Sequence, residues 1–238
     1  MAGEERDDET GGRVGPRFTR DEIAATATRI ADAEGFAAVS MRRLAAELDS
    51  GTMTLYHYVR TKDELLTLVV DAVMGEVVIP NDVPIPHDWR DALTIVATRT
   101  RRALENHPWI LDISDDPPVG PNSVRHIDQS LRAVASLPLG LTEKFDIVSA
   151  VDEYVFGYCL HNRNNQLSSD ADSFDDDAVA YVRGLVQSGD YPQLEAMTRE
   201  YGLEEGWRMI DKHMRDPQRF NRNLARLLNG IEAELRQR

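Results

Sequence analysis

Side chains that could hydrogen-bond to a flat, charged partner are concentrated between Gly51 and Leu66, in the stretch GTMTLYHYVRTKDELL. Its threonines supply small hydroxyls, two tyrosines and a histidine supply flat rings with polar tips, and Lys62 supplies a positive charge. Such groups suit hydrogen bonds to phosphate oxygens and to the edges of bases. Nucleic-acid recognition is therefore the chemistry that this stretch indicates.

Catalytic chemistry has weaker support. The sequence has no HExxH pair, no nucleophile elbow and no glycine-rich loop that could cradle a phosphate. The single cysteine, Cys159, excludes an intramolecular disulfide and any cluster of several cysteines around a metal. We predict that the chain is not an enzyme and has no cofactor and no metal site. A hydrolytic or metal enzyme that uses His107, His126 or His161 with nearby acids is the alternative.

Charge is distributed unevenly along the chain. The 238 residues carry a formal net charge of −14, which by itself argues against binding to phosphates. Residues 13–62, however, contain eight Lys or Arg and six Asp or Glu, a balance of +2, so the rest of the chain carries −16. A mildly basic N-terminal unit on an acidic body can bind DNA while the acidic surface discourages nonspecific adhesion.

Two capping boxes mark helix starts in the N-terminal unit. Thr19 is followed three residues later by Glu22, and Thr61 by Glu64, a spacing that satisfies free amides at a helix start. The first helix ends at Gly35, because glycine tolerates left-handed dihedral angles. The fourth helix begins at residue 62.

Two short helices are predicted between these two. Ser40 caps a helix over 41–48, the residues DSG break it, and residues 52–59 form the next. Two short helices joined by a tight turn and braced by a third make a helix-turn-helix. Leu55 and Val59 lie four apart and face inward, so the second short helix presents the other side chains to a DNA major groove: Thr52, Thr54, Tyr56, His57 and Tyr58.

The residues Thr54 to Leu66 resemble the TLYxHFxxKxxLL pattern of tetracycline-repressor-like (TetR family) regulators, and GFAAVSMRRLAAEL resembles the family's preceding helix. The resemblance covers about sixty residues. It implies that the Tyr56 hydroxyl contacts a phosphate and that Arg42 reaches a base edge. Lys62 opens the fourth helix, where the helix dipole disfavours a cation, so a phosphate contact is expected. Arg17 and Ser40 complete the candidate DNA contacts, and His57 is equally compatible with an ordinary surface position.

The whole chain is predicted to be all-α. We expect a disordered tail over residues 1–15, a helix-turn-helix domain over 16–62, a connecting helix over 63–80, and a larger ligand-binding and dimerisation domain over 81–238. In that last domain, helices are predicted over residues 89–107, 121–136, 142–166, 178–187 and 217–238. The acidic stretch 168–177 lacks the glycine and glutamate of a calcium loop and is interpreted as a solvated loop.

The resemblance also implies an effector cavity in the C-terminal domain. Candidate contacts, taken from their positions on the central helices, are Val96, Thr100, Trp109, His126, Phe145, Ser149, Asp152 and Tyr154. Their composition suits a mid-sized apolar or aromatic effector, and Asp146 or Asp152 would favour a cationic one if either faces the cavity. Alternatively, both carboxylates are exposed to solvent and the charge of the effector is irrelevant. Tetracycline sensors bind a drug–magnesium chelate partly through histidines in the segments that correspond to 76–84 and 110–121. Neither segment contains histidine here, so we do not expect that ligand.

Two apolar stripes resemble the dimer helices of the tetracycline-repressor branch of the family. The candidate interface residues are Val155, Cys159, Leu224, Leu227, Leu228 and Ile231. Alternatively, these stripes close the core of one chain. The expected partners are a second copy, a double-stranded DNA operator and a small-molecule effector.

No apolar run is long enough to cross a membrane and the N-terminus does not resemble a signal peptide, so a cytoplasmic protein is expected. A helical interaction module that has lost DNA binding is a further alternative.

Overall fold

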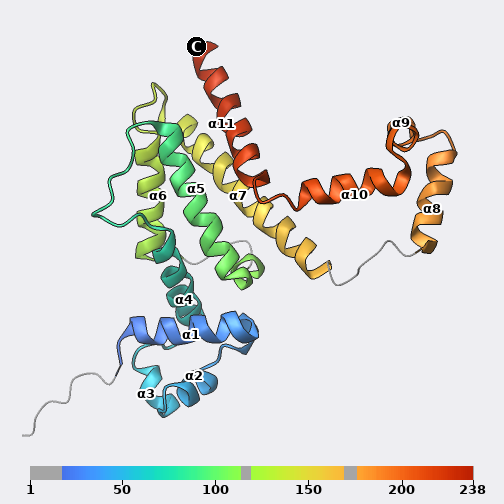
Figure 1. Cartoon of the computed structure of the whole chain (residues 1–238). Coiled ribbons are helices and arrows are strands. Elements are labelled where there is room, and N and C mark those ends of the chain that lie inside the picture. The colour runs from blue at the N-terminus through green and yellow to red at the C-terminus, as the bar shows by residue number, and fades with distance from the viewer. Residues whose placement is uncertain (1–17, 114–118, 169–175, 238) are drawn as a thin grey trace, which may run out of the picture.

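The computed structural model describes residues 18–113, 119–168 and 176–237, and every regular element among them is a helix (Figure 1). The N-terminal part contains α1 (Arg20–Glu34), the short 3-10 helix η1 (Phe36–Ala38), α2 (Met41–Glu47), α3 (Thr52–Tyr56) and α4 (Lys62–Val77). The remainder contains α5 (Trp89–Asn106), the 3-10 helix η2 (Pro108–Asp112), α6 (Pro121–Ala133), α7 (Leu141–Ser168), α8 (Asp176–Gln187), α9 (Pro192–Tyr201), α10 (Leu203–Met214) and α11 (Arg219–Gln237). The all-α prediction is confirmed. The predicted tail at 1–15 and most of the acidic stretch lie outside the described residues.

The predicted starts of α1 and α4 are found, with one difference. Both hydrogen bonds of the Thr19–Glu22 capping box are present, and Gly35 follows α1 with φ of 81°. At α4 the Thr61 hydroxyl accepts from the Glu64 amide, but the Glu64 carboxylate accepts from the amide of Arg60 instead of that of Thr61. The Glu64 carboxylate therefore satisfies the amide of Arg60, one residue before the capping residue Thr61.

The turn between α2 and α3 has its left-handed residue at Asp49, with φ of 46°, whereas Gly51 has φ of −80° and caps α3. The domain core lies beneath this turn. Side chains from α1, α2, α3 and α4 form it, and they include Ile23, Ala27, Leu44, Leu55, Val59 and Val69. The helix-turn-helix is thus held rigidly on α1 and α4.

Helix α4 continues from this domain into the body, where α6 holds it at two points. The Asp71 carboxylate on α4 accepts from the backbone amides of Asn122 and Ser123, at the start of α6. The Gln129 side chain, two turns further along α6, accepts from the amide of Ile79 and donates to its carbonyl, both at 2.8 Å. Because Gln129 is buried, these bonds are shielded from water and fix the end of α4 on α6.

A second core fills the body between α5, α6, α7 and α11. Helix α11 is fastened to α7 where the Tyr154 hydroxyl donates to the carbonyl of Phe220 at 2.8 Å and the two rings lie 5.3 Å apart. Phe220 itself is fully buried.

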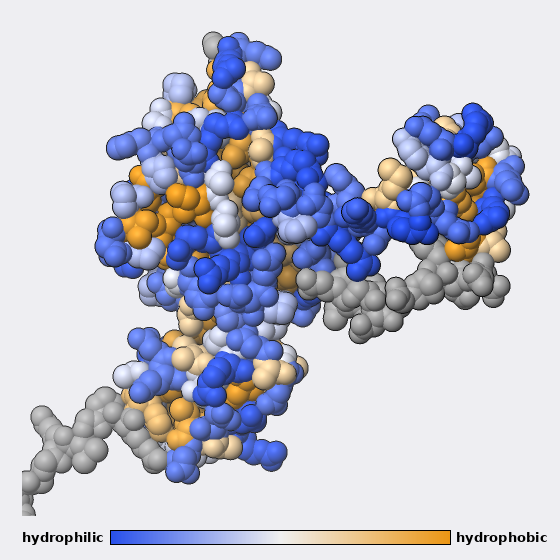
Figure 2. All heavy atoms as spheres, in the orientation of Figure 1, coloured by the Kyte–Doolittle hydropathy of each residue, from blue (hydrophilic) through white to orange (hydrophobic). Residues whose placement is uncertain are grey.

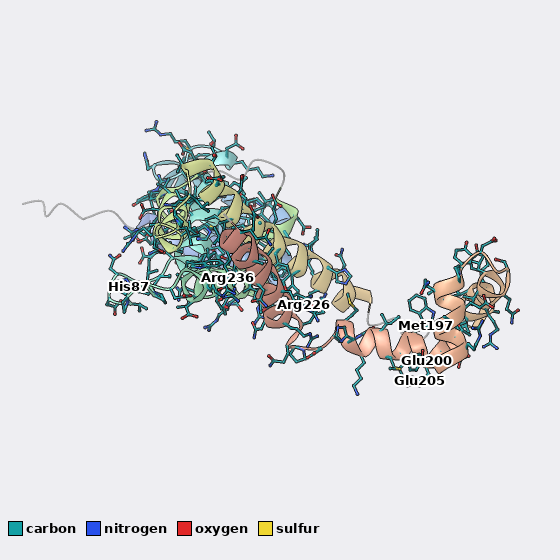
Figure 3. The ribbon with its side chains drawn as sticks, turned by 90° about the horizontal axis from the view of Figure 1, so that it is seen from above. His87, Met197, Glu200, Glu205, Arg226 and Arg236 are labelled. Atoms are coloured by element: carbon teal, nitrogen blue, oxygen red, sulfur yellow. The ribbon has the colours of Figure 1, made fainter. Side chains whose placement is uncertain are left out.

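Helices α8, α9 and α10 form an arm that projects from the body (Figures 1 and 3). Two of them, α9 and α10, are absent from the sequence prediction. They approach closely at Gly206, where an added Cβ would come within 3.0 Å of the Met197 side chain. The arm exposes large apolar or aromatic side chains, namely Tyr181, Tyr191, Tyr201, Met209 and Ile210.

Candidate nucleic-acid interface and effector domain

The exposed face of α3 carries several of the predicted DNA contacts. Leu55 and Val59 are both 0% exposed, as predicted, so their neighbours Tyr56 and His57 turn outward. The sequence analysis overlooked Met53, which is 73% exposed and lies between Thr52 and Thr54. An exposed apolar side chain at this position suits contact with a thymine methyl group.

Tyr58 faces the interior of the domain, in contrast to the prediction. Its hydroxyl accepts from the amide of Phe18 at 3.2 Å, and its ring meets the Phe18 ring edge-on. Its carbonyl accepts from the Arg20 guanidinium at 2.8 Å. Tyr58 therefore holds the start of α1 against the end of α3. This corrects its placement among the DNA-facing side chains, because its half-buried ring packs against the core of the domain.

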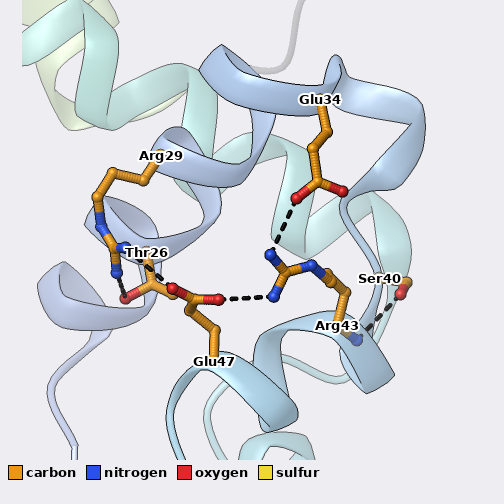
Figure 4. A network of polar contacts seen from close by, with 6 residues as sticks. All are labelled: Thr26, Arg29, Glu34, Ser40, Arg43 and Glu47. Carbon is orange, nitrogen blue, oxygen red and sulfur yellow. Dashed lines mark hydrogen bonds and ion pairs between the residues drawn. The ribbon is translucent and has the colours of Figure 1, made fainter.

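The two neighbouring arginines of α2, Arg42 and Arg43, have different environments. Figure 4 shows the ion pairs of Arg43. Arg43 pairs with Glu34 at 2.9 Å and with Glu47 at 2.6 Å, and Glu47 also pairs with Arg29 at 3.1 Å. Hydrogen bonds to Glu34 and Glu47 raise the pKa of the Arg43 guanidinium. Arg43 thus ties α2 to α1, whereas Arg42 is exposed and accessible to DNA.

The remaining DNA candidates lie at helix starts. The Ser40 hydroxyl accepts from the Arg43 amide at 3.2 Å and so caps α2, although the side chain is exposed. Lys62 is exposed at the first position of α4, next to its capping residue Thr61. Arg17 lies outside the described residues.

In the body, the structure brings His126 of α6 and Asp152 of α7 together. His126 Nε2 and Asp152 Oδ1 are 4.0 Å apart, and that oxygen is buried without a hydrogen-bond partner. Burial raises the pKa of Asp152 to about 6 and lowers the pKa of His126. One turn beyond His126, the Ser130 hydroxyl is also buried without a partner, and the sequence analysis missed it. Buried polar groups left unsatisfied in this way can accept a ligand group or a water molecule.

The other predicted cavity residues are dispersed. Val96 and Thr100 are buried in α5, where the Thr100 hydroxyl donates to the Val96 carbonyl, and Ser149 is half-buried on α7. Phe145 is 48% exposed on α7 and Tyr154 packs on Phe220, so neither joins His126 and Asp152.

Trp109 lies at the junction with the DNA-binding domain. Its ring stacks on Phe36 and it packs with the core of that domain. Phe145, Tyr154 and Trp109 therefore do not line one effector cavity with His126 and Asp152, which corrects that prediction.

A separate cavity of about 500 Å³ lies between the end of α5, η2 and α7. Its lining consists of Leu104, Glu105, Pro108, Leu111, Cys159, Asn162 and Arg163. Burial raises the pKa of the Cys159 thiol to about 12, so this thiol is a packing group and not a nucleophile.

Four of the six predicted interface residues are covered within one chain. Val155, Cys159, Leu224 and Leu228 are between 0% and 3% exposed and belong to the core of the body. A second copy cannot touch side chains that are already enclosed, which corrects their assignment to the dimer interface. Leu227 and Ile231 are half-buried at the edge of the same core. Helix α7 instead exposes Phe145, Phe156 and Leu160, which are 48%, 46% and 43% exposed.

The histidines proposed for an enzyme do not form one site. His107 lies at the junction of α1, α4 and α5, His126 lies beside Asp152, and His161 is exposed on α7. Within the described residues no group of three or more His, Cys, Asp or Glu side chains is arranged to hold a metal ion. No helix among those residues is long and apolar enough to span a membrane.

Comparisons with known proteins agree with this geometry. A model described as "Bacterial regulatory proteins, tetR family" matches residues 23–69, and one described as "Tetracyclin repressor-like, C-terminal domain" matches residues 83–235. The chain is 33% identical over 232 residues to the "HTH-type transcriptional repressor DrrR1" of Streptomyces coeruleorubidus, covering 94% of this chain and 80% of that protein. It is 25% identical over 157 residues to the class E tetracycline repressor protein of Escherichia coli, covering 64% of this chain and 73% of that protein.

Among solved structures, the TetR family protein ActR of Streptomyces coelicolor, in complex with actinorhodin, superposes with a TM-score of 0.65 and 28% identity, covering 91% of this chain and 96% of that one. The helix-turn-helix domain and the helical C-terminal domain are thus both matched to one family. This chain belongs to the TetR family of ligand-responsive, DNA-binding transcriptional regulators.

Proposed function

We propose that this regulator is a homodimeric repressor that a small molecule releases from a two-fold symmetric operator. The exposed side chains of α2, α3 and the start of α4 support the operator contact: Arg42, Met53, Tyr56, His57 and Lys62. Repression is supported by the similar protein DrrR1, which is described as a repressor. An operator is DNA of the cell, so we expect the protein to act in the cytoplasm.

The effector, we infer, carries a cation or another strong hydrogen-bond donor on an apolar or aromatic frame. The observation that carries this inference is the buried, unpartnered Oδ1 atom of Asp152 next to the buried His126, although the Asp152 side chain as a whole is 32% exposed. A positively charged group at this oxygen would stabilise a buried carboxylate that now lacks a partner. ActR, which is similar over most of its length, has been solved in complex with actinorhodin and with (S)-DNPA, which supports a small-molecule effector for this chain.

His126 lies between the two points at which α6 holds α4, namely Asn122 with Asp71 and Gln129 with Ile79. An effector that displaces α6 at His126 would therefore displace α4, and α4 carries the DNA-binding domain. Release of DNA requires that the effector bind this displaced arrangement more tightly than the operator-bound one.

The dimer is proposed to form through the exposed apolar face of α7, with the arm reaching the second copy. Phe145, Phe156 and Leu160 share one side of α7, and Figure 2 shows further apolar side chains over α8 in the arm. In one isolated chain the apolar face of α7 and the apolar side chains of the arm are exposed to water, whereas a second copy would cover them. A dimer also matches an operator with two half-sites.

One experiment tests the DNA and effector proposals in sequence. Fragments that the protein enriches from a random duplex pool are first compared with scrambled fragments at increasing salt, and a repressor should prefer the enriched ones while both affinities fall with salt. Aromatic compounds that carry an alkylamine, which is protonated at neutral pH, are then compared with their N-acetyl derivatives by thermal shift on the DNA-free protein. The amines should stabilise the wild type and lose this effect in Asp152→Asn, whereas equal effects of amines and N-acetyl derivatives would refute the inferred effector class.

A further inference from the structure

One carboxylate joins the DNA-binding domain to the effector domain. Asp32, near the end of α1, has its Oδ1 atom 2.7 Å from Trp109 Nε1 and 2.7 Å from His107 Nδ1. The Trp109 ring also stacks on Phe36 of η1, with centroids 5.5 Å apart and planes 20° apart. His107 and Trp109 are 7% and 5% exposed, so the two rings are buried, whereas the Asp32 side chain is 34% exposed.

The chemistry of these groups makes the contact directional. An indole N–H only donates and a carboxylate only accepts, so Trp109 and Asp32 cannot exchange roles. The other ring nitrogen of His107, Nε2, lies 3.2 Å from Glu76 Oε1 at the end of α4. Asp32 therefore fixes α1 with respect to both η2 and the last turn of α4. Loss of such a bond would leave a buried donor unsatisfied, which costs more than the loss of an exposed one.

The segment η2 is also held by α7. Arg163 of α7 donates to the Pro108 carbonyl at 3.0 Å and pairs with Asp112 Oδ1 at 2.9 Å. Pro108 and Leu111 line the cavity of about 500 Å³ between α5 and α7, so a molecule bound in this cavity would contact η2. A 3-10 segment has poorer hydrogen-bond geometry than an α-helix, and a short one shifts at comparatively low cost.

We propose that Asp32 is a positioning residue: its bonds to Trp109 and His107 set the orientation of the DNA-binding domain, and a displacement of η2 releases that orientation. This proposal rests on the proposed function in one respect, namely that the domain whose orientation Asp32 sets binds an operator. In a dimer, the two recognition helices must match half-sites about 34 Å apart, so a rotation of each domain about α4 would change the match.

The first test requires neither DNA nor an effector. Spin labels are placed on Ala25→Cys in α1 and Ala135→Cys in the connection after α6, both exposed positions, and the labelled chain is diluted with unlabelled protein so that only distances within one chain contribute. Cys159 is 3% exposed, which protects its thiol from the label.

Asp32→Asn and Trp109→Phe should each broaden the distance distribution of this label pair. Trp109→Phe retains a ring that can stack on Phe36 and removes the N–H donor together with part of the volume of the indole. The matched controls Asp21→Asn, on the same helix, and Trp89→Phe, at the start of α5, should leave the distribution narrow.

The second test is operator affinity at fixed salt, measured with an enriched duplex fragment. Removal of a negative charge favours DNA binding in general, so Asp21→Asn should bind at least as tightly as the wild type. Asp32→Asn should instead bind about tenfold more weakly, because only a fraction of the molecules keep the binding orientation.

Distributions that stay narrow in both Asp32→Asn and Trp109→Phe, or an affinity of Asp32→Asn that follows Asp21→Asn, would overturn the proposal. If no fragment were enriched, the operator-binding proposal would fail, whereas the distance distributions would still decide the role of Asp32.

Discussion

Replacement of Asp152 by asparagine should stabilise the protein at neutral pH and have little effect in acid. Burial raises the pKa of Asp152 from its ordinary value of 3.8 to about 6, so the folded state ionises less readily than the unfolded chain. Wild-type stability is therefore lost as pH rises from about 4 through 6, and the full penalty is present above that range. At about 1.36 kcal/mol per pH unit, the upper limit is about 3 kcal/mol. Because the side chain is 32% exposed, solvent screening reduces our expectation to about 1–2 kcal/mol.

The assay is urea unfolding at pH 4, 5.5 and 7.5, at one protomer concentration because dimerisation would add to the apparent stability. Asp146→Asn, an exposed position on the same helix, is the control for a change of net charge. The difference in unfolding free energy between wild type and variant is compared at each pH. A loss of stability in Asp152→Asn at pH 7.5, or a gain of the same size at pH 4, would refute this account of a buried, unpartnered carboxylate.

Three further predictions concern DNA contacts, core packing and the inward-facing tyrosine. Arg42→Ala should relax preference at one base position per half-site by about 1–3 kcal/mol, and Lys62→Ala should weaken all sequences alike, as measured by competition binding with single-base operator variants; uniform weakening by Arg42→Ala would contradict a base contact. Leu228→Ala should lower the free energy of unfolding by about 2–5 kcal/mol, because Leu228 lies in the core of one chain. Leu160→Asp should instead give a folded monomer in sedimentation. If Leu228→Ala were a monomer of unchanged stability, Leu228 would belong to the dimer interface after all. Tyr58→Phe should destabilise the protein by about 1 kcal/mol in thermal unfolding and leave the salt dependence of DNA binding unchanged, and a smaller salt slope would instead indicate a phosphate contact.

The DNA-binding domain was predictable because its signals are local. Thr19 with Glu22 and the positive φ at Gly35 concern neighbouring residues, and the spacing of Leu55 and Val59 defines the buried side of a short helix without knowledge of the rest of the chain. Of the arm, α8 was predicted, but α9 and α10 were missed although Pro192 and Gly202 mark the ends of α9. Helix α10 does have apolar side chains that recur on one side, so its periodicity was present in the sequence and was overlooked, although Met209 and Ile210 remain exposed.

The candidate effector site was predictable only in part, because periodicity identifies a buried face and not its partner. His126 and Asp152 belong to different helices, and nothing in either helix alone indicates that they meet. For the same reason an apolar stripe containing Leu228 is compatible with the core of one chain or with a dimer, and only the packing of α11 on α7 separates these possibilities. Trp109 was assigned to a cavity because its partner Asp32 lies far away in the sequence.

The projecting arm has a consequence for the lifetime of the protein in a cell. If α8, α9 and α10 bury their apolar side chains only against a second copy, then ordering of the arm is bimolecular and its extent depends on how many chains are present. A newly made, unpaired chain would carry a folded body and an accessible arm, which proteases cleave in proportion to the population of open forms. Unpaired copies would then be removed faster than paired ones, so that the surviving pool consists of molecules able to occupy both halves of an operator.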